Sequence, residues 1–388
     1  MNRFRTALLI LMIMSSPWLL GQNTSIEPKP PLGNQKNTLL VNSIGLDGVD
    51  GPYIVNDTLY RVSADSKLII ESEFRKGSLI VRANNASEDA FYLTLNSDFE
   101  IPESSYAMPE KLVVLSDIEG KFNAFSSFLQ ANNIIDENHN WIFGKHHLVL
   151  LGDFVDRGKN VTQTLWLIYK LEHQASAIGG KVHFILGNHE IMNFHGDYRY
   201  NRSKYLKVAQ KISGEDDRET ALRYLYSGRS VLGKWMATKN VIEKIGDYTF
   251  VHAGLSPELL DYRLSLDEIN NRLRSGFHHE DTMKDTVNDF LYSPKGPFWF
   301  RGLVLENLHH NKIQAVDLKR ILSYYDTKKI VVGHTLVEEI STGYQGKVIM
   351  IDVHHGSEKF SGKTKGLLIE GKREYALDDL GNKKALKR

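Results

Sequence analysis

Short runs of aliphatic residues alternate with short polar loops along the chain, and the runs predict buried strands. The clearest run spans 148–151, where four aliphatic residues precede a glycine and then Asp153, Asp156 and Arg157. Unbroken aliphatic runs of this length are typical of strands covered on both faces in α/β proteins. Because ligands in such proteins bind beyond the carboxyl ends of the strands, these charged residues are candidate site residues. Taken alone, the segment also fits a strand followed by a polar turn with a simple ion pair.

The same pattern recurs at four other places. Runs at 111–116, 182–186, 248–251 and 329–332 lead into the polar residues Asp117, Glu119, Asn188, His189, Glu190, His252 and His334. The first three runs are about 35 residues apart, which is the length of a strand, a crossover helix and the next parallel strand. Helical patterns at 122–132 and 161–177 supply the two crossovers. Parallel neighbours would bring the three loops to one edge of a sheet.

These loops offer oxygen and nitrogen ligands for divalent ions such as manganese, iron, zinc or magnesium. The candidate metal ligands are Asp117, Glu119, Asp153, Asn188, His252 and His334. Asp153 lies in the central loop, so it is the natural ligand for two ions to share. Two ions roughly 3.5–4 Å apart can stabilise the attacking and leaving oxygens of a displacement at phosphorus. We therefore expect two divalent metal ions.

The motifs resemble those of the calcineurin-like metallophosphoesterases, specifically the phosphoprotein-phosphatase branch. That pattern consists of D-x-H, G-D-x-x-D-R-G, G-N-H-E and two later histidines. In this chain the motifs stand at 117–119, 152–158 and 187–190, followed by His252 and His334. The flanking segments 191–200 and 297–302 are most similar to the Shewanella-like phosphatases. The resemblance covers roughly residues 110–356.

The resemblance implies an α/β fold in which two mixed β-sheets pack as a sandwich flanked by helices. We place the catalytic domain at 109–375, with helical insertions at about 200–240 and 257–293, and a polar tail at 376–388. Residues 38–105 alternate between apolar and polar positions and contain turn-forming residues, which predicts a small N-terminal all-β accessory domain.

The resemblance also implies an activity, namely hydrolysis of phosphate monoesters, with phosphoproteins among the expected substrates. Attack by a metal-held hydroxide is expected, with His189 as the general acid and Asp156 as the carboxylate that supports it. Arg157 and Arg301 are expected to bind the phosphate oxygens, because a planar guanidinium matches that anion. An alternative with the same metals is hydrolysis of nucleotides or dinucleoside polyphosphates.

Glu119 departs from the family pattern, which has a histidine at this position. A carboxylate ligand would make the first metal site harder and would favour Mn²⁺ or Mg²⁺ over Zn²⁺, so Mn²⁺ is the expected ion. Alternatively, Glu119 points elsewhere and the first site is weak, which would suit a non-catalytic binding or scaffold protein. The His-His-Glu-Asp run at 278–281 also contains ligand types, but such runs are more often solvated helix faces.

The N-terminus predicts export. Basic residues precede an apolar run at 7–14, and small and turn-forming residues follow up to Gly21, so residues 1–21 predict a signal peptide. The apolar run is too short to span a membrane stably. Residues 22–37 are polar and rich in proline, which predicts a linker. We expect a secreted or periplasmic protein without a membrane anchor after cleavage.

Composition narrows the possible partners and chemistries. The 48 basic and 47 acidic residues give a formal net charge of +1, without the basic excess typical of nucleic-acid-binding proteins. We therefore expect a phosphorylated substrate and no nucleic-acid partner. The chain has no cysteine, which excludes disulfides, a thiol nucleophile and lipid attachment through an N-terminal cysteine.

Overall fold

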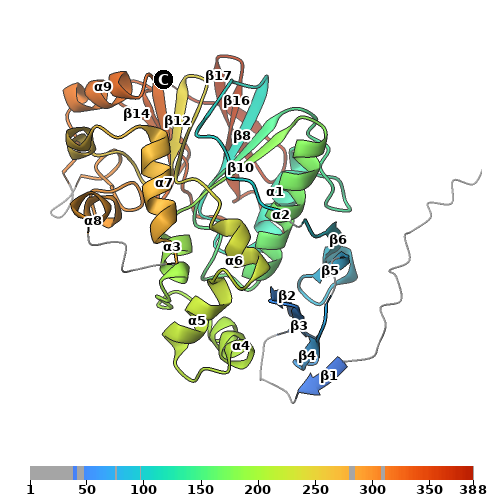
Figure 1. The fold of residues 1–388 in the computed structure, drawn as a ribbon. Coiled ribbons are helices and arrows are strands. Elements are labelled where there is room, and N and C mark those ends of the chain that lie inside the picture. Colours follow the sequence, from blue (N-terminus) through green and yellow to red (C-terminus); the bar gives the residue numbers. More distant parts are fainter. Residues whose placement is uncertain are drawn as a thin grey trace, which may run out of the picture. The chain divides into compact units, whose positions relative to one another are not determined.

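The predicted strands lie in two six-stranded mixed sheets in the computed structural model (Figure 1). The structure describes residues 38–41, 48–74, 77–96, 98–278, 285–306 and 311–387. The first sheet has the order β10 (Lys181–Ile185), β9 (His147–Leu151), β8 (Lys111–Leu115), β16 (Lys365–Glu370), β17 (Arg373–Asp378) and β18 (Lys383–Ala385). The second has the order β14 (Ser341–Gly343), β15 (Val348–Met350), β13 (Lys329–Val332), β12 (Tyr248–Val251), β11 (Ile242–Ile245) and β7 (Ser105–Tyr106).

Strand direction agrees with the spacing of the motifs. Strands β8, β9 and β10 are parallel neighbours, and so are β12 and β13 in the second sheet. Strands β16, β17 and β18 pair antiparallel, which makes the first sheet mixed. The predicted α/β fold with two mixed sheets is confirmed.

The central strands are buried on both faces, which explains their unbroken aliphatic runs. In β8, Leu112 and Val114 belong to an apolar cluster formed by the facing surfaces of the two sheets. Val113 and Leu115 alternate with them and join the larger cluster on the helical side. A strand with two apolar environments has no position for a polar side chain until the strand ends.

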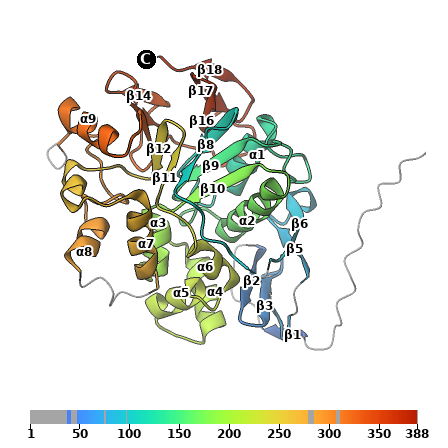
Figure 2. The same cartoon turned by 45° about the horizontal axis from the view of Figure 1, so that its top comes forward.

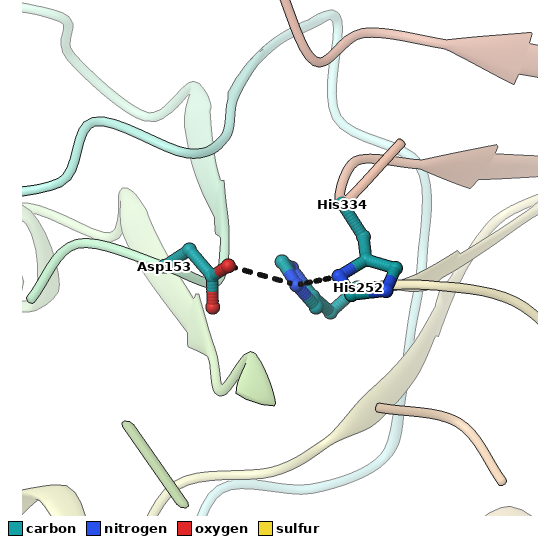
Figure 3. A group of neighbouring side chains, drawn as sticks. All are labelled: Asp153, His252 and His334. Atoms are coloured by element: carbon teal, nitrogen blue, oxygen red, sulfur yellow. Dashed lines mark hydrogen bonds and ion pairs between the residues drawn. The ribbon is translucent and has the colours of Figure 1, made fainter. Parts of the chain in front are cut away.

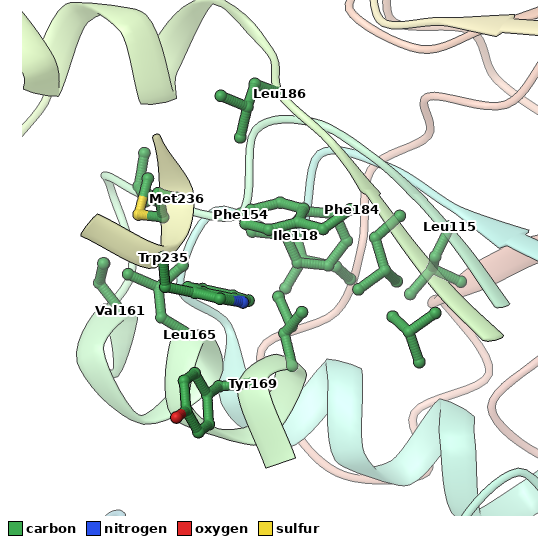
Figure 4. Close-up of a cluster of buried hydrophobic side chains, with 14 of the residues drawn as sticks. Leu115, Ile118, Phe154, Val161, Leu165, Tyr169, Phe184, Leu186, Trp235 and Met236 are labelled. Atoms are coloured by element: carbon green, nitrogen blue, oxygen red, sulfur yellow. The ribbon is translucent and has the colours of Figure 1, made fainter. Parts of the chain in front are cut away.

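Helix α1 (Phe122–Ala131) follows β8 and helix α2 (Val161–Ala177) follows β9, and both helices lie beside the first sheet (Figures 1 and 2). The apolar face of α2 packs against the helical side of the first sheet (Figure 4), and the buried phenylalanines of α1 belong to the same cluster. In this core, Phe184 lies between Phe154 and Trp235, with ring centroids 5.7 and 5.4 Å away. The packing anchors the start of the loop after β9 to the core, because Phe154 immediately follows Asp153.

The predicted insertions are helical. The first contains α4 (Ser203–Ser213), α5 (Arg218–Tyr226) and α6 (Val231–Met236), and the second contains the 3₁₀ helix η2 (Pro257–Tyr262), α7 (Leu266–Gly276) and α8 (Thr286–Tyr292). Two further helices are α3 (Asn188–Phe194), which starts directly at the third motif, and α9 (Ala315–Tyr324).

The N-terminal strands form two small antiparallel sheets. One has the order β1 (Thr38–Val41), β4 (Leu68–Glu71), β3 (Thr58–Val62) and β2 (Asp50–Val55), and the other pairs β5 (Ser78–Arg82) with β6 (Ala90–Thr94), next to the 3₁₀ helix η1 (Ser87–Asp89). Apolar residues of β2 to β6 belong to the same core cluster as residues of α1 and α2. Trp166 Nε1 of α2 also donates a hydrogen bond to Pro52 O at 2.7 Å. The all-β region therefore shares a core with the rest of the chain.

The terminal segments predicted from the sequence span 1–37 and 376–388. The predicted signal peptide, 1–21, and linker, 22–37, lie outside the described residues. Among the described helices, none combines the length and hydrophobicity needed to cross a bilayer. The predicted polar tail is wrong in part, because β17 and β18 extend through 376–378 and 383–385 and widen the first sheet. The edge strand β18 is fully exposed and contains two lysines, a composition that is also typical of a polar tail.

Candidate active site

The loops after β8 and β9 are joined by their backbones. Asp117 N donates to Gly152 O at 3.0 Å, and Glu119 N donates to Asp153 O at 2.8 Å. The loop after β10 joins them through His189 N, which donates to Asp153 Oδ1 at 3.0 Å. Parallel strands end at the same edge, and these bonds hold the three loops in contact there.

The second sheet contributes the two later histidines to the same edge. Gly333 N donates to His252 O at 2.8 Å, which aligns the ends of β12 and β13. His334 N then donates to Asp117 Oδ2 at 3.1 Å, linking the two sheets directly. The five loops predicted from the sequence therefore converge.

Gly152 permits the closest approach between the loops after β9 and β10. Its φ is +82°, a left-handed conformation that glycine adopts most easily. A Cβ atom at this position would lie 2.6 Å from the Gly187 backbone and 2.7 Å from His252 Nδ1. The first glycine of the motif is thus required by space as well as by conformation.

His252 lies at the centre of a buried cluster, with its ring between Asp153 and His334 (Figure 3). Its Nε2 atom is 3.2 Å from Asp153 Oδ2 and 3.2 Å from His334 Nδ1. The same Nε2 atom lies 2.9 Å from Asn188 Oδ1. The structure therefore brings together four of the six predicted metal ligands.

The donor atoms of this cluster fit a divalent cation. His252 Nδ1 lies 2.8 Å from Leu151 O, so it can donate there and leave the Nε2 lone pair facing Asp153. His334 Nε2 is buried and has no hydrogen-bond partner among the described residues. Asp153, His252 and His334 each offer a ligand atom, all within 4.8 Å of one another. One carboxylate with two imidazoles suits zinc, iron or manganese.

Burial and mutual charge shift the pKa values of the cluster. Burial raises the pKa of Asp117 to about 6 and lowers that of His334 well below its usual value. Burial opposes protonation of His252, but the Asp153 carboxylate outweighs it and raises the His252 pKa to about 10. Burial would likewise raise the pKa of Asp153, yet His252 and His189 hold it below its usual range. The buried carboxylates therefore favour the binding of a positive charge between these loops.

His189 and Asp156 form a buried pair next to the cluster. His189 Nδ1 lies 2.6 Å from Asp156 Oδ2, and His189 Nε2 lies 3.7 Å from Asp153 Oδ2. Although burial lowers the pKa of His189, the carboxylates of Asp153 and Asp156 outweigh it and raise that pKa. Asn193 and Asn201 donate to the other Asp156 oxygen at 3.0 and 2.7 Å, fixing its orientation. The imidazole can thus be held protonated.

Glu190 holds the loop backbones. Its carboxylate accepts hydrogen bonds from the amides of Gly187, Asp153 and Phe154 at 2.8 to 2.9 Å, and from Val155 at 3.3 Å. The side chain is fully buried. Burial raises its pKa, and these amides act in the opposite direction.

Glu119 and Arg157 interact with each other. Arg157 Nη1 forms an ion pair with Glu119, and Lys121 Nζ binds the other carboxylate oxygen at 3.1 Å. The Arg157 guanidinium also lies 4.8 Å from the centre of the Tyr200 ring. Thus one predicted metal ligand is paired with cations, and it is not among the residues gathered around His252.

Arg301, the second predicted phosphate-binding residue, lies at the His334 side of the site. Its Nη1 atom donates to His334 O at 2.9 Å and to Thr335 Oγ1 at 3.2 Å.

Six of the ten predicted site residues have a left-handed backbone conformation. Their φ values lie between +50° and +69°, and the residues are Asp117, Glu119, Asp153, Asp156, Arg157 and His334. Non-glycine residues seldom adopt this conformation, and such strain concentrates at functional sites.

Sequence reasoning missed Asp352. This buried carboxylate follows β15, which is parallel to β13, and burial together with Asp117 raises its pKa to about 8. The signal was present, because Asp352 ends the apolar run 348–351. In the run at 278–281, His278 contacts Phe194 edge-on, and residues 279–281 lie outside the described residues.

Comparison with solved structures gives a close overall match. The cold-active protein-tyrosine phosphatase of the psychrophile Shewanella sp. has a TM-score of 0.77 and 32% sequence identity. The match covers 88% of this chain and all of that one. This similarity shows that the two chains share a fold.

Sequence relatives carry related names. Shewanella-like protein phosphatase 2 of Arabidopsis thaliana is 27% identical over 305 residues, covering 66% of this chain and 74% of its own. Shewanella-like protein phosphatase 1 of Plasmodium berghei is 28% identical over 229 residues, covering 58% and 61%. The resemblance seen in the motifs is confirmed.

The family profile accounts for the part of the chain that carries the site. The calcineurin-like phosphoesterase profile matches residues 110–338, which include five converging loops and every predicted site residue. The chain therefore belongs to the calcineurin-like phosphoesterase family.

Proposed function

We propose that this protein is an exported, metal-dependent phosphatase that hydrolyses phosphate monoesters, with phosphoproteins as substrates. The observation that carries the proposal is the buried cluster around Asp153 and His252 beside the His189–Asp156 pair. A cation site next to a protonated imidazole is the combination that a phosphate ester needs, because its oxygens and its leaving group both gain negative charge.

One divalent ion would be held by Asp153, Asn188, His252 and His334, and a second by Asp117, Asp153 and Glu119. Bound ions would neutralise charge on the phosphate and lower the pKa of a water molecule in contact with them. The remaining work falls to side chains around the ions, which orient the ester and transfer a proton.

His189 is the proposed general acid. The Asp156 carboxylate lies 2.6 Å from Nδ1 and holds this nitrogen in its protonated form. It thereby directs Nε2 towards Asp153. A proton on Nε2 would be given to the leaving oxygen of the ester, and Asp156 would stabilise the charged imidazole until then. Arg157 and Arg301 would bind the non-bridging oxygens.

The phosphoprotein part of the proposal comes from the relatives. The similar Shewanella structure is described as a protein-tyrosine phosphatase, and two of the sequence relatives are named as protein phosphatases. The export part rests on the basic and apolar pattern of residues 1–21.

Reconstitution of metal-stripped protein tests the activity. Mn²⁺, Mg²⁺ or Zn²⁺ would be added separately, and phosphate release would be measured from p-nitrophenyl phosphate, a phosphotyrosine peptide, a phosphoserine peptide and ATP. We expect turnover of the monoesters that depends on the added ion, with Mn²⁺ most effective. Folded protein that releases no phosphate with any ion would contradict the proposal, and preference for ATP would redirect it to nucleotides.

A further inference from the structure

The Glu119 carboxylate is occupied by cations that belong to the chain itself. Arg157 pairs with one oxygen and Lys121 with the other, the latter at 3.1 Å. Only 12% of the Glu119 side chain is exposed, so water cannot readily take the place of either partner. A metal ion that uses Glu119 must therefore displace at least one of these pairs.

The other half of the centre is already assembled. Asp153, Asn188 and His334 all contact His252 Nε2, and among the described residues no lysine forms an ion pair with any of these four side chains. His334 Nε2 has no hydrogen-bond partner among the described residues. At this position an ion displaces contacts between its own ligands, such as Asp153–His252, whereas an ion that uses Glu119 must displace a lysine or an arginine.

Arg157 is placed to exchange partners. Its backbone is fixed, because its amide donates to Tyr200 O at 3.0 Å and its carbonyl accepts from Arg202 Nε at 2.7 Å. Its side chain is 46% exposed and rests on the Tyr200 ring, so a phosphate in solution can reach the guanidinium. A phosphate dianion offers two oxygens to the planar guanidinium and competes well with a single carboxylate oxygen.

Resting on the proposed function, we propose that the two metal positions fill in order and that phosphate controls the second. The first ion binds at the preassembled position around His252. The second is opposed by Lys121 and Arg157 until a phosphate group takes Arg157 and releases Glu119 as a ligand. The positive charges of Lys121 and Arg157 repel an incoming metal ion strongly at a half-buried site. A bound phosphate anion offsets this repulsion.

The coupling must be reciprocal, so phosphate tightens the second ion by the same factor as that ion tightens phosphate. Calorimetric titration of metal-stripped protein with Mn²⁺, with and without inorganic phosphate, measures the factor. We expect one tight ion per chain without phosphate, and a second site whose Kd falls by about 5- to 150-fold when phosphate is present. Metal analysis after desalting gives an independent count of retained ions.

Three variants separate this mechanism from simple bridging of two ions by phosphate. Arg157→Gln frees Glu119, so the second ion should bind tighter without phosphate and the phosphate effect should shrink to less than about 3-fold. Glu119→His restores the family ligand and should retain two ions without phosphate. Glu258→His is the matched control, because Glu258 forms a similar pair with Lys295 elsewhere, and it should behave like the parent protein.

The outcomes distinguish the inference from the function on which it rests. Two ions of equal affinity in the parent protein without phosphate would overturn ordered filling. An undiminished phosphate effect in Arg157→Gln would overturn the exchange of partners. If no variant binds any ion, the metal-dependent phosphatase itself is contradicted. The inference is supported if the parent protein binds one ion tightly without phosphate and two with it, and if this phosphate effect is lost in Arg157→Gln.

Discussion

At the scale of single residues, Asp153 has the central position. Its carboxylate contacts His252 and accepts the His189 amide, while its own amide is held by Glu190. Its backbone has a φ of +59°, which the surrounding loops impose. Several independent contacts thus determine the orientation of one side chain.

Replacing Asp153 by Asn should remove both the ion and the activity. An amide lacks the negative charge that a shared ligand supplies. Mutating a residue that only hydrogen-bonds to a metal ligand commonly lowers metal affinity or activity by about 10- to 100-fold, so we expect kcat to fall by more than about 100-fold here. Phosphate release and metal analysis would be measured together. Asp261→Asn, on the exposed part of η2, is the control. Retention of activity and ion content would show that the shared ligand is misassigned.

Glu190→Gln tests the support beneath the loops. The amide turns an N–H₂ group towards backbone amides that now donate to a carboxylate, leaving buried donors unsatisfied. We expect the free energy of unfolding to fall by about 2–4 kcal/mol and kcat to fall with it. Urea denaturation would measure the first effect. Unchanged stability would mean that the four hydrogen bonds contribute little to the fold.

The chemistry at this scale was only partly predictable. Motif spacing predicted that Asp153, Asn188, His252 and His334 would lie together, because each follows the end of a buried strand within three residues. It could not show that Glu119 pairs with Lys121 and Arg157, since that depends on side-chain directions in loops with left-handed residues. No sequence pattern distinguishes a carboxylate that binds a metal from one that binds an arginine.

At the scale of elements, the site depends on loops that touch because their strands are parallel neighbours. Aliphatic runs predicted the five strands well, since strands buried on both faces leave a strong signal. The predicted polar tail, 376–388, contains the end of β17 and all of β18, because alternation in an exposed strand is easily confused with a loop. Their place in the sheet comes from pairing, of β17 with β16 and of β18 with β17, and this pairing is not visible in composition.

Gly152→Ala tests the contact between the loops after β9 and β10. The added methyl would lie 2.6 Å from the Gly187 backbone, so a loop must move and carry Asp153 or Asn188 away from the cluster. We expect a large loss of activity and a lower melting temperature. Gly144→Ala is a matched control, because Gly144 also has a positive φ, +62°, but nothing lies within 4 Å of the new atom. Equal losses in both variants would indicate backbone strain alone.

At the scale of the whole molecule, the core joins the N-terminal strands to the catalytic part. His139 packs against both Phe91 of β6 and Phe122 of α1, with each ring centroid 5.6 Å away, and the two phenylalanine rings stack on each other. It is 2% exposed, and burial followed by the nearby Lys170 lowers its pKa to about 4. Protonation of this side chain would therefore act against the folded state.

The sign of this effect is fixed by linkage. The unfolded chain, with an ordinary histidine pKa of about 6.5, binds the proton first as the pH falls, so stability decreases between about pH 6.5 and 4. His139 should account for a loss of about 2 kcal/mol between about pH 7 and pH 5. Urea denaturation at both values, in the parent and in His139→Asn, measures it. An equal loss in the variant would contradict the assignment to His139.

The central claim is that a divalent ion sits where the two sheets meet, bound to Asp153. Anomalous X-ray scattering from crystals of protein purified without added metal tests it most directly, because it gives the identity and position of each ion. The account predicts a peak within bonding distance of Asp153, Asn188, His252 and His334. A crystal with bound metal elsewhere and no peak among these four side chains would contradict it.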